Sequence, residues 1–226
     1  QFSIKEPRLT NDINITGTLN VLLAARDAGV RRVVYSASSS AYGPRHPMPL
    51  REDMAPEPVI PYAIQKRVGE QYCGMFSRFY GLETVSLRYF NVYGPRQTTE
   101  SDGPYATVIG IFLEQRQKGK PMTIVPDGRQ RRDFTHVSDV ARANLLAMQS
   151  DKVGQGEIIN VGSGSNESVL EVAGLIGGPT VFAEPRLGEA RETLADNRRA
   201  KELLSWETQV YFADGIMELK KMHGLI

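Results

Sequence analysis

The sequence has very few cysteines, tryptophans and histidines. Among its 226 residues, Cys73 is the single cysteine and Trp206 the single tryptophan. One cysteine excludes both an intrachain disulfide and a thiolate metal cluster. The three histidines, His46, His136 and His223, are scattered, and no cysteine or acidic cluster joins them. We therefore expect no metal site.

Long apolar runs and excess charge are also missing. No apolar run approaches the roughly 18–20 residues that span a bilayer, and residues 1–5 contain no apolar signal-peptide core. Lys and Arg total 27 against 26 acidic residues, a net charge of +1. This balance gives no reason to expect a nucleic-acid or membrane partner. The sequence predicts a cytoplasmic protein.

Helical and strand patterns alternate along the chain, which is typical of an α/β sheet. A helical pattern over 11–28 ends at Gly29, and a short buried strand is expected at 31–36. Pro61 suits the first position of a helix that runs to about Tyr80, followed by a strand over 84–90. Further helices are expected near 104–118, 137–149, 168–176 and 212–222, the third starting at Ser168, which has capping-box spacing to Glu171.

Tyr62 and Lys66 carry the clearest chemical signal, behind a serine run at 38–40. Four residues apart, they share one face of a helix. A phenol has a pKa of about 10, and a neighbouring ammonium lowers it, so Tyr62 suits a general acid or base. A serine hydroxyl can position the same substrate oxygen. The alternative is a surface Tyr and Lys on an amphipathic helix, since this spacing alone also occurs by chance.

Four segments occur together in a fixed order: VYSASSSAYG at 34–43, Pro61-Tyr62 with Lys66, LRYFNVYGPRQ at 87–97, and RDFTHV at 132–137. Together they closely resemble the extended short-chain dehydrogenases/reductases that modify nucleotide sugars, especially UDP-hexose and UDP-N-acetylhexosamine 4-epimerases. The resemblance runs from about residue 11 to 215.

This resemblance implies a doubly wound, Rossmann-type parallel sheet with a smaller mixed α/β substrate lobe. Residues 1–95 and 134–163 would form the NAD-binding domain, and 96–133 and 164–226 the lobe. The glycine-rich βαβ unit that opens such domains is not found in the sequence, so we expect about 80–90 family residues to be missing at the front. If these 226 residues were the whole polypeptide, the sheet would have an unpaired edge and NAD would bind weakly or not at all. We favour the alternative that the sequence is a truncated part of a longer chain.

The resemblance also assigns catalytic and cofactor roles. Ser38 matches the catalytic Ser/Thr, with Ser39 as the alternative because a serine run leaves the register open. Tyr62 matches the base and Lys66 the lysine that holds the nicotinamide ribose. The remaining candidates for contact with NAD are Asn14, Ser36, Tyr89 and Val92, and Asn14 has an equally good interpretation as an ordinary polar helix residue.

For the nucleotide sugar, the resemblance implies three groups of contacts. Arg132, Arg186 and Asn91 would hold the diphosphate, and a guanidinium suits bidentate phosphate binding. Glu189 would contact the nucleoside ribose, and Thr193 would lie beside the sugar C2 substituent. Ala106, Thr107, Val108 and Phe112 resemble the wall around the uracil, although Val108 and Phe112 also have the spacing of core residues.

The implied reaction is C4 epimerisation of UDP-glucose or UDP-N-acetylglucosamine by transient oxidation with bound NAD, in a homodimer. A dehydratase fits less well, because the family's dehydratases usually carry Thr-Asp-Glu where this chain has serines at 38–40. A reductase, a decarboxylase and a non-catalytic sugar-nucleotide-binding relic stay open. The GxG at 162–164 lies too far along the chain for a pyrophosphate loop, and a strand-to-helix turn explains it better.

Overall fold

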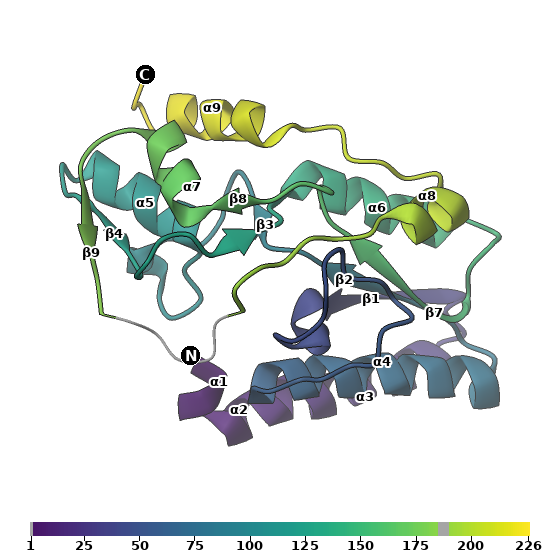
Figure 1. Ribbon diagram of the computed structural model, residues 1–226. Helices are drawn as coiled ribbons and strands as arrows, with labels where there is room; N and C mark the ends of the chain where they lie inside the picture. The colour runs from purple at the N-terminus through teal and green to yellow at the C-terminus, as the bar shows by residue number, and fades with distance from the viewer. Residues whose placement is uncertain (1, 185–189) are drawn as a thin grey trace.

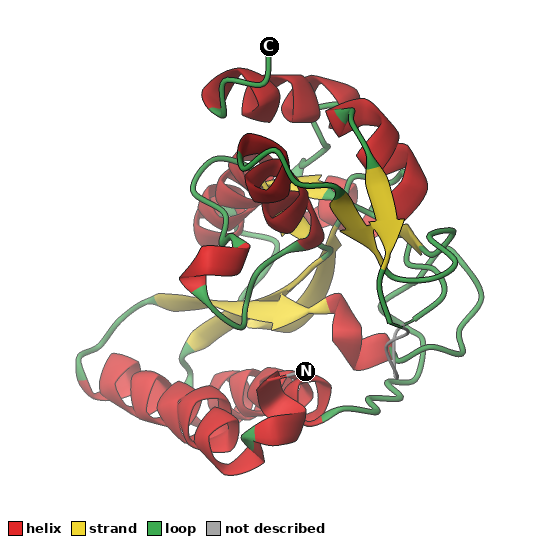
Figure 2. Cartoon of the chain, turned by 90° about the vertical axis from the view of Figure 1, so that its left-hand side faces the viewer, coloured by secondary structure: helices red, strands yellow, loops and turns green. Residues whose placement is uncertain are grey.

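The computed structural model describes residues 2–184 and 190–226. Its main sheet is parallel, with the strand order β1-β2-β7. Helices pack on both faces of this sheet (Figures 1 and 2). The predicted doubly wound α/β class is confirmed by this arrangement. The strands are β1 (Arg32–Ser38), β2 (Glu83–Tyr89) and β7 (Gln155–Val161); the helices are α3 (Gly17–Asp27) and α4 (Pro61–Tyr80) on one face, and α6 (Val137–Gln149) and α8 (Arg198–Leu204) on the other.

The alternating side chains of β2 explain why helices pack on both faces of the main sheet. Val85 and Leu87 are fully buried in the cluster formed with α6 and α8. Thr84 and Arg88 point to the opposite face, where the Thr84 hydroxyl donates to the Cys73 carbonyl of α4 at 2.8 Å. Successive side chains of a strand point to opposite faces, so a strand with both sets buried lies in the interior of a layered fold.

The bounds of α4 are those expected from the sequence. Pro61 occupies the start of the helix, where its missing N–H costs nothing. The helix ends before Gly81, which has the left-handed φ of 68° that glycine tolerates. The capping box at Ser168 is also present, with reciprocal hydrogen bonds to Glu171 at the start of α7 (Val169–Ile176).

The N-terminal helical region differs from the single helix expected over 11–28. Ile13, an apolar residue of the helical pattern expected over 11–28, is 57% exposed. It lies in a π-helical turn, whose wider winding shifts the side chains that follow, and Leu22 of α3 is buried as expected. The segments before α3 are α1 (Phe2–Lys5), α2 (Pro7–Asn11) and the π-turn η1 (Asp12–Thr16).

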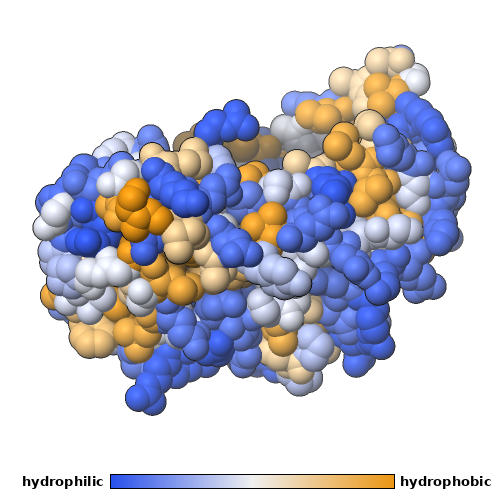
Figure 3. Space-filling model, turned by 90° about the horizontal axis from the view of Figure 1, so that it is seen from above, coloured by the Kyte–Doolittle hydropathy of each residue, from blue (hydrophilic) through white to orange (hydrophobic). Residues whose placement is uncertain are grey.

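The surface is mixed. Seen from above, on the side of α9, apolar residues lie in separate patches between hydrophilic ones (Figure 3). No helix in the described part of the chain is long and apolar enough to cross a membrane. Within the described residues, β1 pairs with β2 on one side only.

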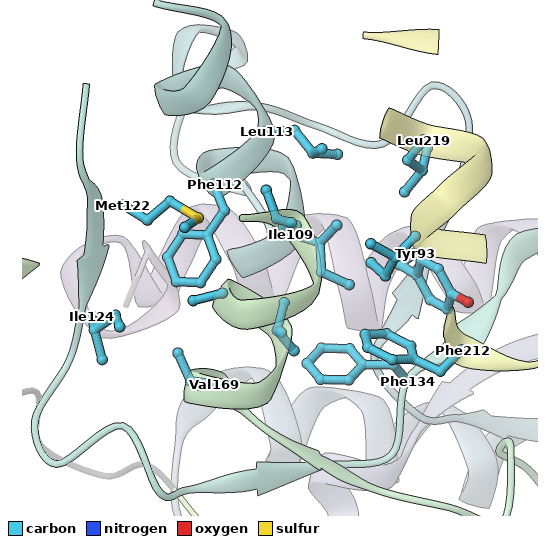
Figure 4. Close-up of a cluster of buried hydrophobic side chains, with 14 residues drawn as sticks. Tyr93, Ile109, Phe112, Leu113, Met122, Ile124, Phe134, Val169, Phe212 and Leu219 are labelled. Carbon is cyan, nitrogen blue, oxygen red and sulfur yellow. The ribbon is translucent and has the colours of Figure 1, made fainter. Parts of the chain in front are cut away.

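A second layer of structure packs around its own apolar core beside the sheet. Phe112, Phe134, Phe212 and Tyr93 meet in this core, and the rings of Phe134 and Phe212 stack with centroids 5.1 Å apart (Figure 4). It is built mainly from α5 (Val108–Gln117), α7, α9 (Phe212–Met222), and the paired strands β4 (Met122–Ile124) and β9 (Thr180–Phe182).

Short elements connect the main sheet to the second layer. The proposed division into two domains at 95/96, 133/134 and 163/164 stays a prediction. Helix α8 falls within 164–226 but packs on β7, together with the buried Trp206. The short elements are η2 (Ser39–Tyr42), β3 (Val92–Tyr93), η3 (Glu100–Asp102), β5 (Arg131–Arg132), β6 (Thr135–His136) and β8 (Glu167–Ser168).

Candidate active site

Ser38 ends β1 and begins the η2 turn. Its Oγ accepts from the Ser40 amide at 3.2 Å and from the Ser40 hydroxyl at 2.9 Å. The Ser38 hydroxyl also lies close enough to the Tyr62 phenol to favour its ionised form and so to lower its pKa. All three serines of the run line the same cavity, but Ser38 is the one that acts on the phenol in this way.

Tyr62 and Lys66 lie one turn apart on α4, on the side that faces β1. The Lys66 ammonium donates to the carbonyl oxygen of Ser36 at 2.9 Å. It also lies over two aromatic rings, 5.3 Å from the centroid of Tyr35 and 5.8 Å from that of Tyr62. Tyr62 and Lys66 therefore share one face of α4, as predicted. This face brings the phenol and the ammonium together with the serine at the carboxyl end of β1.

The expected lowering of the Tyr62 pKa by Lys66 is not what the geometry gives. Burial raises the pKa of Tyr62 above its ordinary value, and the hydrogen bond with Ser38 only partly offsets this. Burial also lowers the pKa of Lys66. The ammonium hydrogen-bonds the Ser36 carbonyl and lies over the ring of Tyr62, so desolvation dominates both groups.

A cavity of about 430 Å³ opens beside these residues, at the carboxyl ends of β1 and β2. Parallel sheets of this type bind ligands at that end of the strands. Asn91 follows β2 and donates from Nδ2 to the Asp133 carbonyl at 2.9 Å and to the Thr193 hydroxyl at 3.3 Å. The predicted residues that line the cavity are Ser38, Ser39, Tyr62, Tyr89, Asn91, Val92, Arg132 and Thr193.

A second cavity, of about 310 Å³, shares Asn91 and Arg132 with the first. Ala106, Val108 and Phe112 line it, as predicted for a base-binding wall. Phe112 belongs to the apolar core as well, as the alternative interpretation predicts, and its role in binding stays a prediction. The two cavities together make an elongated site with a cationic residue at the junction.

Thr107 differs from its three predicted neighbours. Its side chain accepts from the Gly110 amide at 3.2 Å, caps the start of α5, and donates to Gln97 at 3.0 Å. It is not among the residues that line either of these cavities. Its predicted role in substrate binding therefore has no geometric support, while its role as a helix cap does.

The candidate cofactor residues occupy two places. The Ser36 hydroxyl lies 3.3 Å from the Tyr89 hydroxyl, which in turn donates to Asn144 at 2.9 Å. Asn14 lies further away in the chain's π-turn and donates to Gln65 of α4 at 2.9 Å. Asn14 thus fastens the preceding helix to α4, which favours its structural interpretation.

Asp133 is a site residue that the sequence analysis missed. It is fully buried, and its carboxylate accepts from the amides of Ser163, Gly164 and Ala195 at 2.6, 3.1 and 3.0 Å. The GxG turn therefore binds an internal carboxylate. Through its own amide Asp133 also donates to Thr193 at 3.2 Å, so it holds one wall of the cavity. Only its position beside Arg132 hinted at this role.

Two predicted substrate ligands, Arg186 and Glu189, lie outside the described residues. No group of three or more His, Cys, Asp or Glu side chains that could hold a metal ion occurs in the ranges 2–184 and 190–226. Every assigned role in catalysis or binding stays a prediction at this point.

Comparison with known proteins agrees with this geometry. The UDP-glucose 4-epimerase of Mycolicibacterium smegmatis is 39% identical over 221 residues, which cover 95% of this chain and 69% of that protein. The structure of Thermotoga maritima UDP-glucose 4-epimerase with UDP-glucose superimposes with a TM-score of 0.91 at 35% identity, covering 99% of this chain and 74% of that one.

A UDP-N-acetylglucosamine 4-epimerase from Methanobrevibacter ruminantium, in complex with UDP-N-acetylmuramic acid, is equally similar in fold. Its TM-score is 0.90 at 33% identity, covering 99% of this chain and 73% of that one. Residues 1–162 match the family described as NAD dependent epimerase/dehydratase. With most of its length matched in this way, the chain belongs to the NAD dependent epimerase/dehydratase family.

Proposed function

We propose that this chain carries the catalytic residues and the nucleotide-sugar site of a UDP-sugar 4-epimerase that uses NAD. One observation carries the proposal: Ser38, Tyr62 and Lys66 meet beside a cavity that continues, past Asn91 and Arg132, into a second one. Such a site suits a ligand with a reacting sugar at one end and a nucleoside at the other. The related epimerases support the same reaction.

Tyr62 would take the proton from the sugar C4 hydroxyl and return it after the sugar has turned. Ser38 and Tyr62 line the same cavity, and their hydroxyls lie close enough to affect each other, so a substrate oxygen can bind between them. Ser38 would orient that oxygen, because its own position is fixed by two bonds from Ser40. Burial favours the protonated phenol without ligand, so Tyr62 must lose this proton before it can accept the one from C4, and the accepted proton is the one it returns to the keto sugar.

Bound NAD supplies the hydride acceptor and donor that no side chain can provide. The residues present fit its nicotinamide ribose: the Lys66 ammonium and the Tyr62 hydroxyl are both half-buried donors at the end of β1. Tyr89 and Val92 would form the adjoining wall, with the Tyr89 hydroxyl fixed by Asn144.

The nucleotide would run from the first cavity into the second. Arg132 and Asn91 line both, and the arginine suits a diphosphate at the junction, since a guanidinium binds phosphate oxygens well. To contact the diphosphate as well, the Asn91 amide would have to exchange its hydrogen bond with Asp133 or Thr193. Ala106, Val108 and Phe112 would then cover the base. Thr193 would face the sugar and, as a small residue, leave room for an N-acetyl group at C2, so both UDP-glucose and UDP-N-acetylglucosamine would be accepted.

We also propose a homodimer. Helices α3 and α4 carry the exposed apolar side chains Val21, Ile64 and Phe79, which are 60%, 47% and 71% accessible. Burial of such side chains against a second copy would remove them from water. Light scattering after gel filtration tests this: a single species of monomer mass at all concentrations would contradict it.

NMR of the sugar products tests the reaction itself. The intact enzyme, incubated with UDP-glucose or with UDP-N-acetylglucosamine, should produce the galacto epimer until both forms coexist, without net formation of NADH. Matched incubations with the Tyr62→Phe variant should leave the substrate unchanged. Release of carbon dioxide from a uronic-acid substrate, or stoichiometric consumption of NADH, would instead indicate a decarboxylase or a reductase.

A further inference from the structure

Asn160 is a fully buried residue of β7 whose side chain contacts three separate segments of the chain. Its Oδ1 accepts a hydrogen bond from the Tyr42 hydroxyl at 2.7 Å. Its Nδ2 donates to the Leu50 carbonyl at 2.9 Å and to the Asp196 carbonyl at 3.4 Å. These partners lie 118, 110 and 36 positions away in the sequence, so one amide joins distant parts of the fold.

The chemistry of these contacts fixes the orientation of the amide. If it were rotated by 180°, Oδ1 would face the carbonyl oxygens of Leu50 and Asp196, and acceptors would meet acceptors. Nδ2 therefore stays on the two carbonyls, and Oδ1 stays on the hydroxyl of Tyr42, which is itself fully buried. A buried amide that is paired at both ends favours one arrangement of its neighbours, because any other arrangement leaves a polar group unsatisfied.

All three contacts lead to walls of the first cavity. The tyrosine ends the η2 turn, which carries the candidate catalytic serines. Leu50 lines the cavity and belongs to the loop 44–60, and Asp196 ends the segment 190–196, in which Thr193 lines the cavity. We call this loop and this segment the wall segments. The asparagine itself is not among the residues that line either cavity, so it acts on the site only through its neighbours.

The two wall segments are also paired with each other at the point where Asn160 meets them. The Leu50 amide donates to the Leu194 carbonyl at 2.7 Å, and the Leu50 carbonyl accepts from the Asp196 amide at 3.0 Å. The same Leu50 carbonyl accepts from Nδ2 of Asn160. A shift of the asparagine amide would therefore move both wall segments together, and with them the residue directly before Leu194, which is Thr193.

We propose that Asn160 is a positioning residue that holds the η2 turn and the two wall segments in the arrangement that receives the sugar. This inference rests on the proposed function. The two ends of the amide have different effects. Oδ1 acts through Tyr42 on the η2 turn and so on turnover, whereas Nδ2 acts through Leu50 on the wall segments and so on binding of the sugar. The nucleotide end of the site is independent of both, because none of the three partners lines the second cavity.

Two variants of the intact enzyme separate these effects. Tyr42→Phe removes only the hydroxyl that pairs with Oδ1, so kcat should fall about 5- to 20-fold while the KM for UDP-glucose stays within about twofold. Asn160→Asp keeps Oδ1 but places an acceptor against the Leu50 carbonyl, so this KM should rise at least about 10-fold. The calorimetric affinity for UDP, which has no sugar, should stay within about twofold in both variants.

Asp139→Asn is the matched control for a general loss of stability. Asp139 is also a buried polar residue, and its carboxylate accepts from Thr208 and from the amide of Gln209. It is not among the residues that line either cavity. This variant should have a lower urea midpoint, as Asn160→Asp should, but unchanged kcat and KM. The urea midpoints of all three variants identify those that are folded in the assay.

Three outcomes would overturn the inference. These are wild-type kcat and KM in both Tyr42→Phe and Asn160→Asp, equal changes in Asn160→Asp and Asp139→Asn, or a loss of UDP affinity as large as the loss of UDP-glucose affinity. If Asn160→Asp does not fold, Tyr42→Phe decides alone: a lower kcat at unchanged KM supports the inference, and a normal kcat overturns it.

Failure of the proposed function gives a different result. A wild-type enzyme that binds UDP-glucose without epimerising it rejects the proposed reaction. The affinities for UDP-glucose and UDP in Asn160→Asp then still test the positioning role: a selective loss of UDP-glucose binding supports it, and an equal loss of both ligands overturns it. Normal epimerisation by the wild type and by both variants rejects the positioning role alone.

Discussion

Arg88 and Glu70 form a buried bidentate ion pair between strand β2 and helix α4. Arg88 donates from Nε at 2.7 Å and from Nη2 at 2.8 Å to the two carboxylate oxygens, and the side chains are 1% and 0% exposed. Glu70 lies on α4 one turn beyond Lys66 and two beyond Tyr62. Arg88 directly precedes Tyr89 on β2. The pair therefore sets the register of α4 over the sheet and, with it, the position of both site residues.

Breaking this pair should be costly. Arg88→Met leaves the Glu70 carboxylate buried with only Arg67 as a cationic partner, so the free energy of unfolding should fall by about 3–5 kcal/mol. Urea titration measures this. Replacing both partners, by Glu70→Leu with Arg88→Met, should recover most of the loss, because no buried charge remains.

Arg67→Met is the control for the ion pair. The Arg67 side chain is 28% exposed and contacts the same carboxylate at 2.8 Å, so its loss should cost less than about 1 kcal/mol. Similar losses of unfolding free energy in Arg67→Met and Arg88→Met would mean that the Arg88–Glu70 ion pair stabilises the fold no more than the partly exposed Arg67 contact does.

Tyr62→Phe should lower kcat at least ~100-fold while UDP still binds, because the ring stays and only the proton-transferring hydroxyl is lost. Ser38→Ala should reduce turnover more than Ser39→Ala, since Ser38 is the serine that lowers the pKa of Tyr62. Steady-state kinetics on the intact enzyme decides both. Near-normal turnover of Tyr62→Phe would show that Tyr62 is not the general acid or base. A larger loss of turnover in Ser39→Ala than in Ser38→Ala would assign the role of the catalytic serine to Ser39.

The sequence predicted local features well and long-range ones poorly. The bounds of α4 and the capping box at Ser168 followed from proline, glycine and Ser/Glu spacing, which act within a few residues. The contacts of Asp133 with the 163–164 turn and of Arg88 with Glu70 join residues 18 to 31 positions apart. No periodicity reports such pairs, because they depend on which strands become neighbours. The predicted effect of Lys66 on Tyr62 was wrong for a related reason: burial is a property of the packed fold.

Acid should weaken the link between α6 and the segment after Trp206. Burial disfavours the Asp139 carboxylate, but hydrogen bonds from Arg142, Thr208 and the amides of Gln209 and Val210 outweigh it and lower its pKa. A lowered folded-state pKa stabilises the protein above the unfolded value of about 3.9, and this contribution is lost as pH falls through the folded value.

Asp139→Asn tests this pH dependence. The variant should be less stable than the wild type at pH 7, and the difference between their urea midpoints should narrow as the pH falls below about 4. Measurements of the two proteins at several pH values check the sign. A difference that stays constant, or grows in acid, would show that Asp139 does not contribute through its charge.

Thr193 allows a test of sugar selectivity that separates size from hydrogen bonding. Its hydroxyl accepts from Asn91 and from the Asp133 amide, and the residue lines the cavity with Ser38 and Tyr62. Thr193→Tyr should abolish turnover of UDP-N-acetylglucosamine while UDP-glucose is still epimerised, because the larger ring fills the space beside C2.

Two further variants at Thr193 control for the lost hydrogen bonds. Thr193→Ser keeps a small hydroxyl and should retain both substrates. Thr193→Val keeps the volume without the hydroxyl, so any loss should be equal for the two sugars. If Thr193→Tyr also slows both sugars equally, the change acts through the Asn91 and Asp133 contacts and not through size. Unchanged selectivity in the tyrosine variant would show that the C2 substituent never meets this residue.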